Sequence, residues 1–112
     1  MSKKDLVQLT RQAREYLEEN NFHSAESYYQ KLLRLNDECC LVVAASGAEK
    51  FIDKGQLDSA FRLIKTIFSV ELNDPRFEPV LESFLISSRD KFIAENENDK
   101  AQWISEKIEI CF

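Results

Sequence analysis

The sequence predicts an all-α protein built from three antiparallel helical hairpins, and three observations lead to this class. The 112 residues include only 2 Gly and 2 Pro, which leaves little material for the many tight turns of a β-sandwich. Apolar residues recur at intervals of three and four, as on one face of a helix. No stretch alternates between apolar and polar residues for long enough to form a strand. Short polar segments interrupt this pattern, so we expect six helices with short connections.

The first hairpin is expected to join helices at 3–19 and 22–35. Asn20 and Asn21 separate them, since short polar residues favour turns. In the second helix, we expect one of Tyr28 and Tyr29 to pack inside the hairpin and the other to face a neighbouring element. The two apolar stripes hold Leu6, Leu9, Ala13, Tyr16 and Leu17, then Ala25, Tyr28, Tyr29, Leu32 and Leu33.

The second hairpin is expected to join helices at 38–53 and 56–72. Lys54 and Gly55 separate them, a basic residue and a glycine that suit a helix C-terminus. The third hairpin is expected to join helices at 76–95 and 99–111 across a polar break at 96–98. The sequence therefore predicts three units of one kind, at about 6–37, 41–73 and 76–111.

The first two units repeat each other when the chain is shifted by 35 residues. The shift keeps both helices and the turn between them in register, which one amphipathic stripe alone would not do. It superimposes Leu6 on Leu41, Ala13 on Ala48, Tyr16 on Phe51, Asn20 on Gly55, Ala25 on Ala60 and Tyr29 on Ile64. The third unit diverges, because matching Ala101 to Ala60 needs a shift of 41 and places Arg89 at a small-residue position.

This pattern resembles the tetratricopeptide repeat, a two-helix unit of about 34 residues. The family has a small residue in its first helix, an aromatic residue three positions later and a small residue in its second helix. The residues that match are Ala13, Tyr16 and Ala25, then Ala48, Phe51 and Ala60. The family's tryptophan is replaced by Leu9 and Ala44. The resemblance implies a single helical-repeat domain over 1–112, stacked as a short superhelix.

The resemblance also implies a concave groove lined by the first helix of each unit. The residues expected to face it are Val7, Thr10, Arg14, Leu17, Val42, Ala45, Glu49 and Ile52. Some members of the family grip the C-terminal carboxylate of chaperones at such positions. In this sequence only Arg14 could bind such a carboxylate, and Glu49 would repel it, so chaperone tails are disfavoured. An apolar peptide, helical or extended, is the favoured ligand.

The last helix offers a second candidate surface. The last five residues of the sequence, 108–112, are mostly apolar. Residues at adjacent helical positions face different sides of a helix, so some of these apolar side chains should be exposed. We expect a C-terminal contact surface formed by Trp103, Ile110 and Phe112.

The predicted function is a non-catalytic scaffold or adaptor, a subunit of an intracellular multiprotein complex that binds a protein partner through the groove or the C-terminal helices. The alternative is a self-associating structural N-terminal arm of a larger helical-repeat subunit. In that case two copies of the chain could form a homodimer.

Composition and motifs argue against other classes. A net charge of -5 disfavours nucleic-acid binding, and the longest apolar run, Cys39 to Ala45, is too short to span a bilayer. These features favour a soluble protein of the cytoplasm or nucleus. The three cysteines and His23 match no metal spacing, so no metal or cofactor is expected. No glycine-rich phosphate loop or catalytic motif is present, so no enzyme is expected.

A competing resemblance covers only the start of the chain. The segment from Asp5 to Gln8, followed by two helices, is similar to the opening of 14-3-3 proteins, where these helices form the dimer interface. The residues that would grip a phosphopeptide have no counterparts here, so the tetratricopeptide-like reading is preferred.

Overall fold

The protein is all-helical in the computed structural model, which describes residues 3–34, 38–69 and 78–111. The six helices are α1 (Lys3–Glu18), α2 (Phe22–Arg34), α3 (Glu38–Asp53), α4 (Leu57–Ser69), α5 (Glu78–Ala94) and α6 (Asn98–Cys111). No strand occurs within these ranges. The expected six helices are confirmed there, with ends that differ from the predicted ones by a few residues. The predicted extensions of two helices into 70–77 lie outside the described residues.

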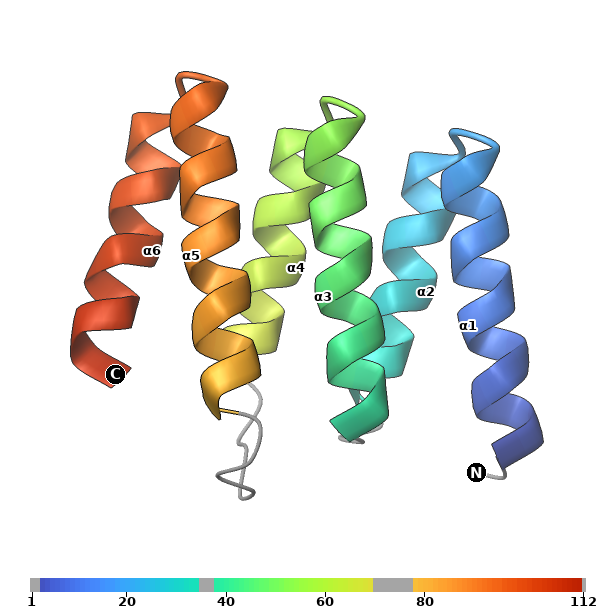
Figure 1. The fold of residues 1–112 in the computed structure, drawn as a ribbon. Coiled ribbons are helices and arrows are strands. Elements are labelled where there is room, and N and C mark those ends of the chain that lie inside the picture. Colours follow the sequence, from blue (N-terminus) through green and yellow to red (C-terminus); the bar gives the residue numbers. More distant parts are fainter. Residues whose placement is uncertain (1–2, 35–37, 70–77, 112) are drawn as a thin grey trace. The chain divides into compact units, whose positions relative to one another are not determined.

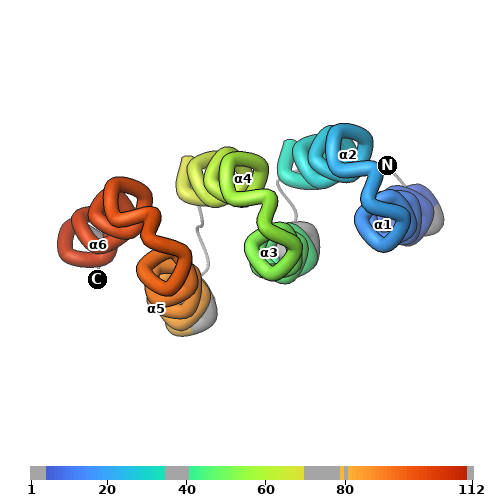
Figure 2. The backbone as a smooth tube through the Cα atoms, turned by 90° about the horizontal axis from the view of Figure 1, so that it is seen from above, coloured from blue at the N-terminus to red at the C-terminus, as the bar shows by residue number. Residues whose placement is uncertain are grey.

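Contacts divide the chain into two compact units, residues 1–71 and 72–112. In the first unit, α1 packs against α2 and α3 packs against α4, each pair running antiparallel (Figure 1). Helix α2 also contacts α3 and α4, so the two hairpins share one core. Viewed from above, α1 and α3 lie on one side of this unit, and α2 and α4 lie on the other (Figure 2).

The same helix-ending turn closes all three hairpins. In the first, the Asn20 amide donates to Leu17 and the Asn21 amide donates to Tyr16, the paired bonds of a Schellman motif. Equivalent pairs end α3 at Gly55 and Gln56, and α5 at Asn96 and Glu97. The residue at the left-handed position has a φ of 62° at Asn20, 78° at Gly55 and 61° at Asn96. Asparagine thus takes the role of glycine in two of these three turns, because it tolerates this conformation better than most residues.

Small and aromatic side chains form the core of the first unit. Ala13, Ala25, Ala48 and Ala60 are fully buried, which lets the helices approach closely. The two neighbouring tyrosines divide as expected. The Tyr28 ring lies 5.4 Å from the Tyr16 ring inside the first hairpin. The Tyr29 ring lies edge-on, 6.1 Å from the Phe51 ring of the second hairpin.

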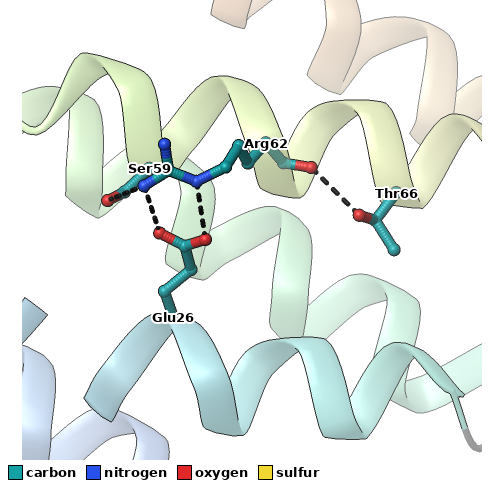
Figure 3. Close-up of polar contacts among 4 residues, drawn as sticks. All are labelled: Glu26, Ser59, Arg62 and Thr66. Carbon is teal, nitrogen blue, oxygen red and sulfur yellow. Dashed lines mark hydrogen bonds and ion pairs between the residues drawn. The ribbon is translucent and has the colours of Figure 1, made fainter. Parts of the chain in front are cut away.

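A polar bridge joins the two hairpins on the side of α2 and α4 (Figure 3). The Arg62 guanidinium donates two hydrogen bonds to the Glu26 carboxylate, at 2.7 and 2.8 Å, and a third to the Ser59 hydroxyl. The guanidinium lowers the pKa of Glu26 below its ordinary value, because it stabilises the ionised carboxylate. At the turns, Lys54 donates to the Asn20 side chain at 3.0 Å. These contacts add polar links between two hairpins that already share a buried core.

The second unit is the hairpin of α5 and α6. Its fully or nearly fully buried side chains include Leu85, Phe92, Ala101 and Ile104. The shift of 41 residues that aligns this hairpin with the second one also superimposes its turn, Asn96 on Gly55. Arg89, which that alignment places at a small-residue position, is only partly exposed and pairs with Asp90 at 3.2 Å. The adjacent Ser88 is the small residue that is fully buried.

Candidate binding groove on helices α1 and α3

A groove of about 550 Å³ is lined mainly by α1, with one residue from α3. Seven of its lining residues belong to α1 and one belongs to α3. They are Leu6, Val7, Thr10, Arg11, Arg14, Glu15, Glu18 and Val43. Most of these side chains are exposed, and Val7 alone has 57% of its surface in contact with solvent. The groove is therefore open, with apolar side chains at one end and charged side chains along the rest.

Helical spacing explains how one helix supplies both a core and a groove. Positions 7, 11, 14 and 18 recur at intervals of three and four, so they form one stripe of α1. Ala13 and Leu17 lie on a different stripe and are buried. The helix thus packs inward through small and aliphatic residues and presents its charged stripe outward.

Tyr29 of α2 packs against α3 within electrostatic reach of two groove residues. Its ring passes so close to Gly47 of α3 that a Cβ atom added there would lie 2.6 Å from the ring. Burial raises the pKa of the Tyr29 phenol, and the groove residues Arg14 and Glu18 act on it in opposite directions. A cation favours the phenolate and an anion opposes it. The phenol therefore lies within electrostatic reach of the groove, on the side of α2.

Four charged side chains dominate the groove, two arginines followed by two glutamates. Among the residues the structure describes, Arg11, Arg14, Glu15 and Glu18 form no ion pair and no side-chain hydrogen bond. All four are exposed. Their hydrogen-bonding groups therefore face solvent and can pair with an incoming molecule without first breaking a contact in the protein.

The structure brings together three of the eight residues predicted to line the groove. Val7, Thr10 and Arg14 line it, as the sequence predicts. Val42, Ala45 and Glu49 do not line this groove, although Val42 is 46% exposed on α3.

Two of the predicted groove residues are corrected. Leu17 and Ile52 are only 1% and 2% exposed, so they belong to the core and not to a binding surface. Each lies four residues after a buried alanine, Ala13 or Ala48, and so shares its inward face.

The prediction missed five of the lining residues: Leu6, Arg11, Glu15, Glu18 and Val43. The signal for the four on α1 was present in the sequence. Arg11, Glu15 and Glu18 extend the stripe that starts at Val7 by intervals of three and four, and Leu6 lies four residues before Thr10. A period count on α1 alone would have recovered these four residues. The contribution of Val43 to the groove depends on how α3 lies against α1, and the spacing of residues along one helix cannot reveal that.

The predicted C-terminal surface is partly described. Ile110 is 74% exposed, and Trp103 is half-buried with the Lys107 ammonium 5.3 Å from its ring centroid. Phe112 lies outside the described residues. The expectation that part of this apolar end is exposed is therefore confirmed at Ile110.

Of the four candidate metal ligands, only His23 has a described side chain. His23 is exposed, and no three His, Cys, Asp or Glu side chains described by the structure converge in a way that would hold a metal ion. The side chains of Cys39, Cys40 and Cys111 lie outside the described set. Within the same residues, none of the helices combines the length and apolar character needed to cross a bilayer.

No family model matches the chain, and neither does any curated protein or solved structure. The tetratricopeptide-like reading therefore stays a prediction that depends on the residue pattern.

Proposed function

We propose that the chain is a non-catalytic protein-interaction module that binds a segment of a partner protein in the groove of α1 and α3. The three hairpins are repeats of one tetratricopeptide-like unit, stacked as a short superhelix. The shared turn chemistry at Asn20, Gly55 and Asn96 supports the repeat, since all three hairpins close with the same pair of backbone hydrogen bonds.

The observation that carries the function is the open groove on α1. It combines an exposed valine with four charged side chains that have no partner in the described protein. A surface of this kind favours a peptide, which offers side chains for the apolar end and charges for the rest. Catalysis is not favoured by it, because Glu15 and Glu18 are exposed and catalytic carboxylates need burial or a close partner to shift their pKa values.

A capture experiment with matched variants tests this proposal. The tagged chain is used to capture partners from a cell lysate, in parallel with Val7→Asp and Ile110→Asp. Both substitutions place a charge at an exposed apolar position, so neither should unfold the protein. We expect Val7→Asp to lose the captured partner and Ile110→Asp to retain it. A partner that survives Val7→Asp would contradict the groove as the binding site.

Self-association through the last helix is the second candidate. Exposed Ile110 favours it, because a second copy covering this side chain would recover part of its burial free energy. Light scattering after size-exclusion chromatography measures the molar mass of the chain in solution and so tests self-association against binding of a different protein. A dimer that Ile110→Asp converts to a monomer would favour self-association, and a monomer at all concentrations would exclude it.

A further inference from the structure

We infer that the groove selects an extended peptide segment in which an acidic residue stands between an apolar residue and a basic residue. The inference rests on the proposed function and specifies the chemistry of the partner. It follows from the order of side chains along α1. Leu6 and Val7 lie at one end, Arg11 and Arg14 follow, and Glu15 and Glu18 lie at the other end.

The order of charges determines which ligand is complementary. A ligand side chain next to Arg11 and Arg14 is stabilised if it is acidic, and one next to Glu15 and Glu18 is stabilised if it is basic. The ligand's acidic residue is therefore flanked by its apolar and basic residues whichever way the peptide runs. An arrangement with the basic residue in the middle would place like charges together at both positions.

Helix geometry sets the spacing. With a rise of 1.5 Å per residue, Val7 lies about 8 Å along the axis from the midpoint of the arginines, and that midpoint lies about 6 Å from the midpoint of the glutamates. An extended chain advances about 3.3 Å per residue and points alternate side chains to one side, so positions i, i+2 and i+4 match these intervals within the reach of long side chains. The expected pattern is apolar, any, acidic, any, basic, or its reverse.

A single extended strand of five residues can place three side chains in the groove while its other side stays in solvent.

Parallel selections with a charge-swapped variant test the inference. The variant carries Arg11→Glu, Arg14→Glu, Glu15→Arg and Glu18→Arg, so its composition and net charge are those of the parent chain. It also places acidic residues four positions before basic ones, the more favourable orientation on a helix, so it should fold. A displayed library of random peptides is selected on each protein, with peptides that bind a Val7→Asp variant removed first.

The parent chain should enrich peptides with the acidic residue in the middle, and the charge-swapped variant should enrich peptides with the basic residue in the middle. Each enriched class should bind its own protein about tenfold more tightly than the swapped one at low salt, with the difference reduced at high salt. Peptides that depend on Val7 but show no charge order would overturn the inference and leave the proposed function standing. Absence of any peptide that depends on Val7 would contradict both.

Discussion

The contact between Gly47 and the Tyr29 ring makes a quantitative prediction about Gly47→Ala. A Cβ atom at position 47 would lie 2.6, 2.7 and 2.9 Å from three carbons of the ring. Carbon atoms in contact ordinarily lie about 3.5–4.0 Å apart, so the ring or the helix must move by about 1 Å. The ring is buried and packed against Phe51, so it has little room to retreat.

The expected net effect is a loss of stability. Overpacking of a core costs about 1–3 kcal/mol, and alanine recovers about 1 kcal/mol through its better helix propensity. We therefore expect Gly47→Ala to lower the free energy of unfolding by up to about 2 kcal/mol. Thermal unfolding followed by circular dichroism should show Tm lowered by up to about 8 °C for a chain of this size.

A double-mutant cycle identifies the cause. Tyr29→Leu removes the ring carbons that an added methyl group would meet, so in that background Gly47→Ala should be neutral or stabilising by up to about 1 kcal/mol. Gly55→Ala is the control, because its φ of 78° strains any side chain although no atom lies within 4 Å of the added Cβ. Its cost of about 1–2 kcal/mol should be the same with and without Tyr29. Stabilisation of the parent chain by Gly47→Ala would refute the close contact.

Three further variants test other parts of the structure. Asn96→Gly should stabilise the third hairpin by about 0.5–1 kcal/mol in a denaturant titration, since φ is 61° there, and unchanged or reduced stability would contradict the turn geometry. Ala48→Trp should unfold the protein or destabilise it strongly, because Ala48 is fully buried, and an unchanged Tm would refute the repeat register. Glu26→Gln should cost about 0.5–1 kcal/mol at neutral pH, a modest value because Arg62 is largely exposed. Ionisation of Glu26 stabilises the fold at pH values above the ordinary pKa of the carboxyl group, and this stabilisation is lost as the pH falls through the lowered pKa of Glu26. The difference between the parent chain and Glu26→Gln should therefore shrink on acidification, and a difference independent of pH would contradict the pairing.

Local features of the fold could be predicted because they depend on residues close in the sequence. The spacing of apolar residues located the six helices, and the shift of 35 residues placed Asn20 at the turn position of Gly55. Both follow from backbone geometry over fewer than ten residues. The division of roles between Tyr28 and Tyr29 was also predictable, because adjacent helical positions point in different directions.

Features that join separate hairpins could not be predicted in this way. The sequence indicated that Ala48 marks a close helix contact, but the importance of Gly47 depends on the Tyr29 ring reaching it from another hairpin. The pairing of Glu26 with Arg62 likewise spans 36 residues, and no local pattern couples the two. Long-range contacts of this kind require knowledge of how the second hairpin sits on the first.

The groove was predicted in part. The helix that supplies it was identified, and Val7, Thr10 and Arg14 were placed on it. Leu17 and Ile52 were assigned to it because the repeat pattern was followed to the end of each helix. Both positions lie on the face of the helix that packs into the core, and both side chains are buried.

The central claim is that a partner segment binds along α1 and next to Val43. Mapping of backbone amide chemical shifts tests this most directly, with the tightest peptide from the selection titrated into the labelled protein. The account predicts that shifts and broadening concentrate on residues 6–18 and around Val43, and that Val7→Asp abolishes them. Shifts concentrated on α6 around Ile110, with residues 6–18 unchanged, would contradict it.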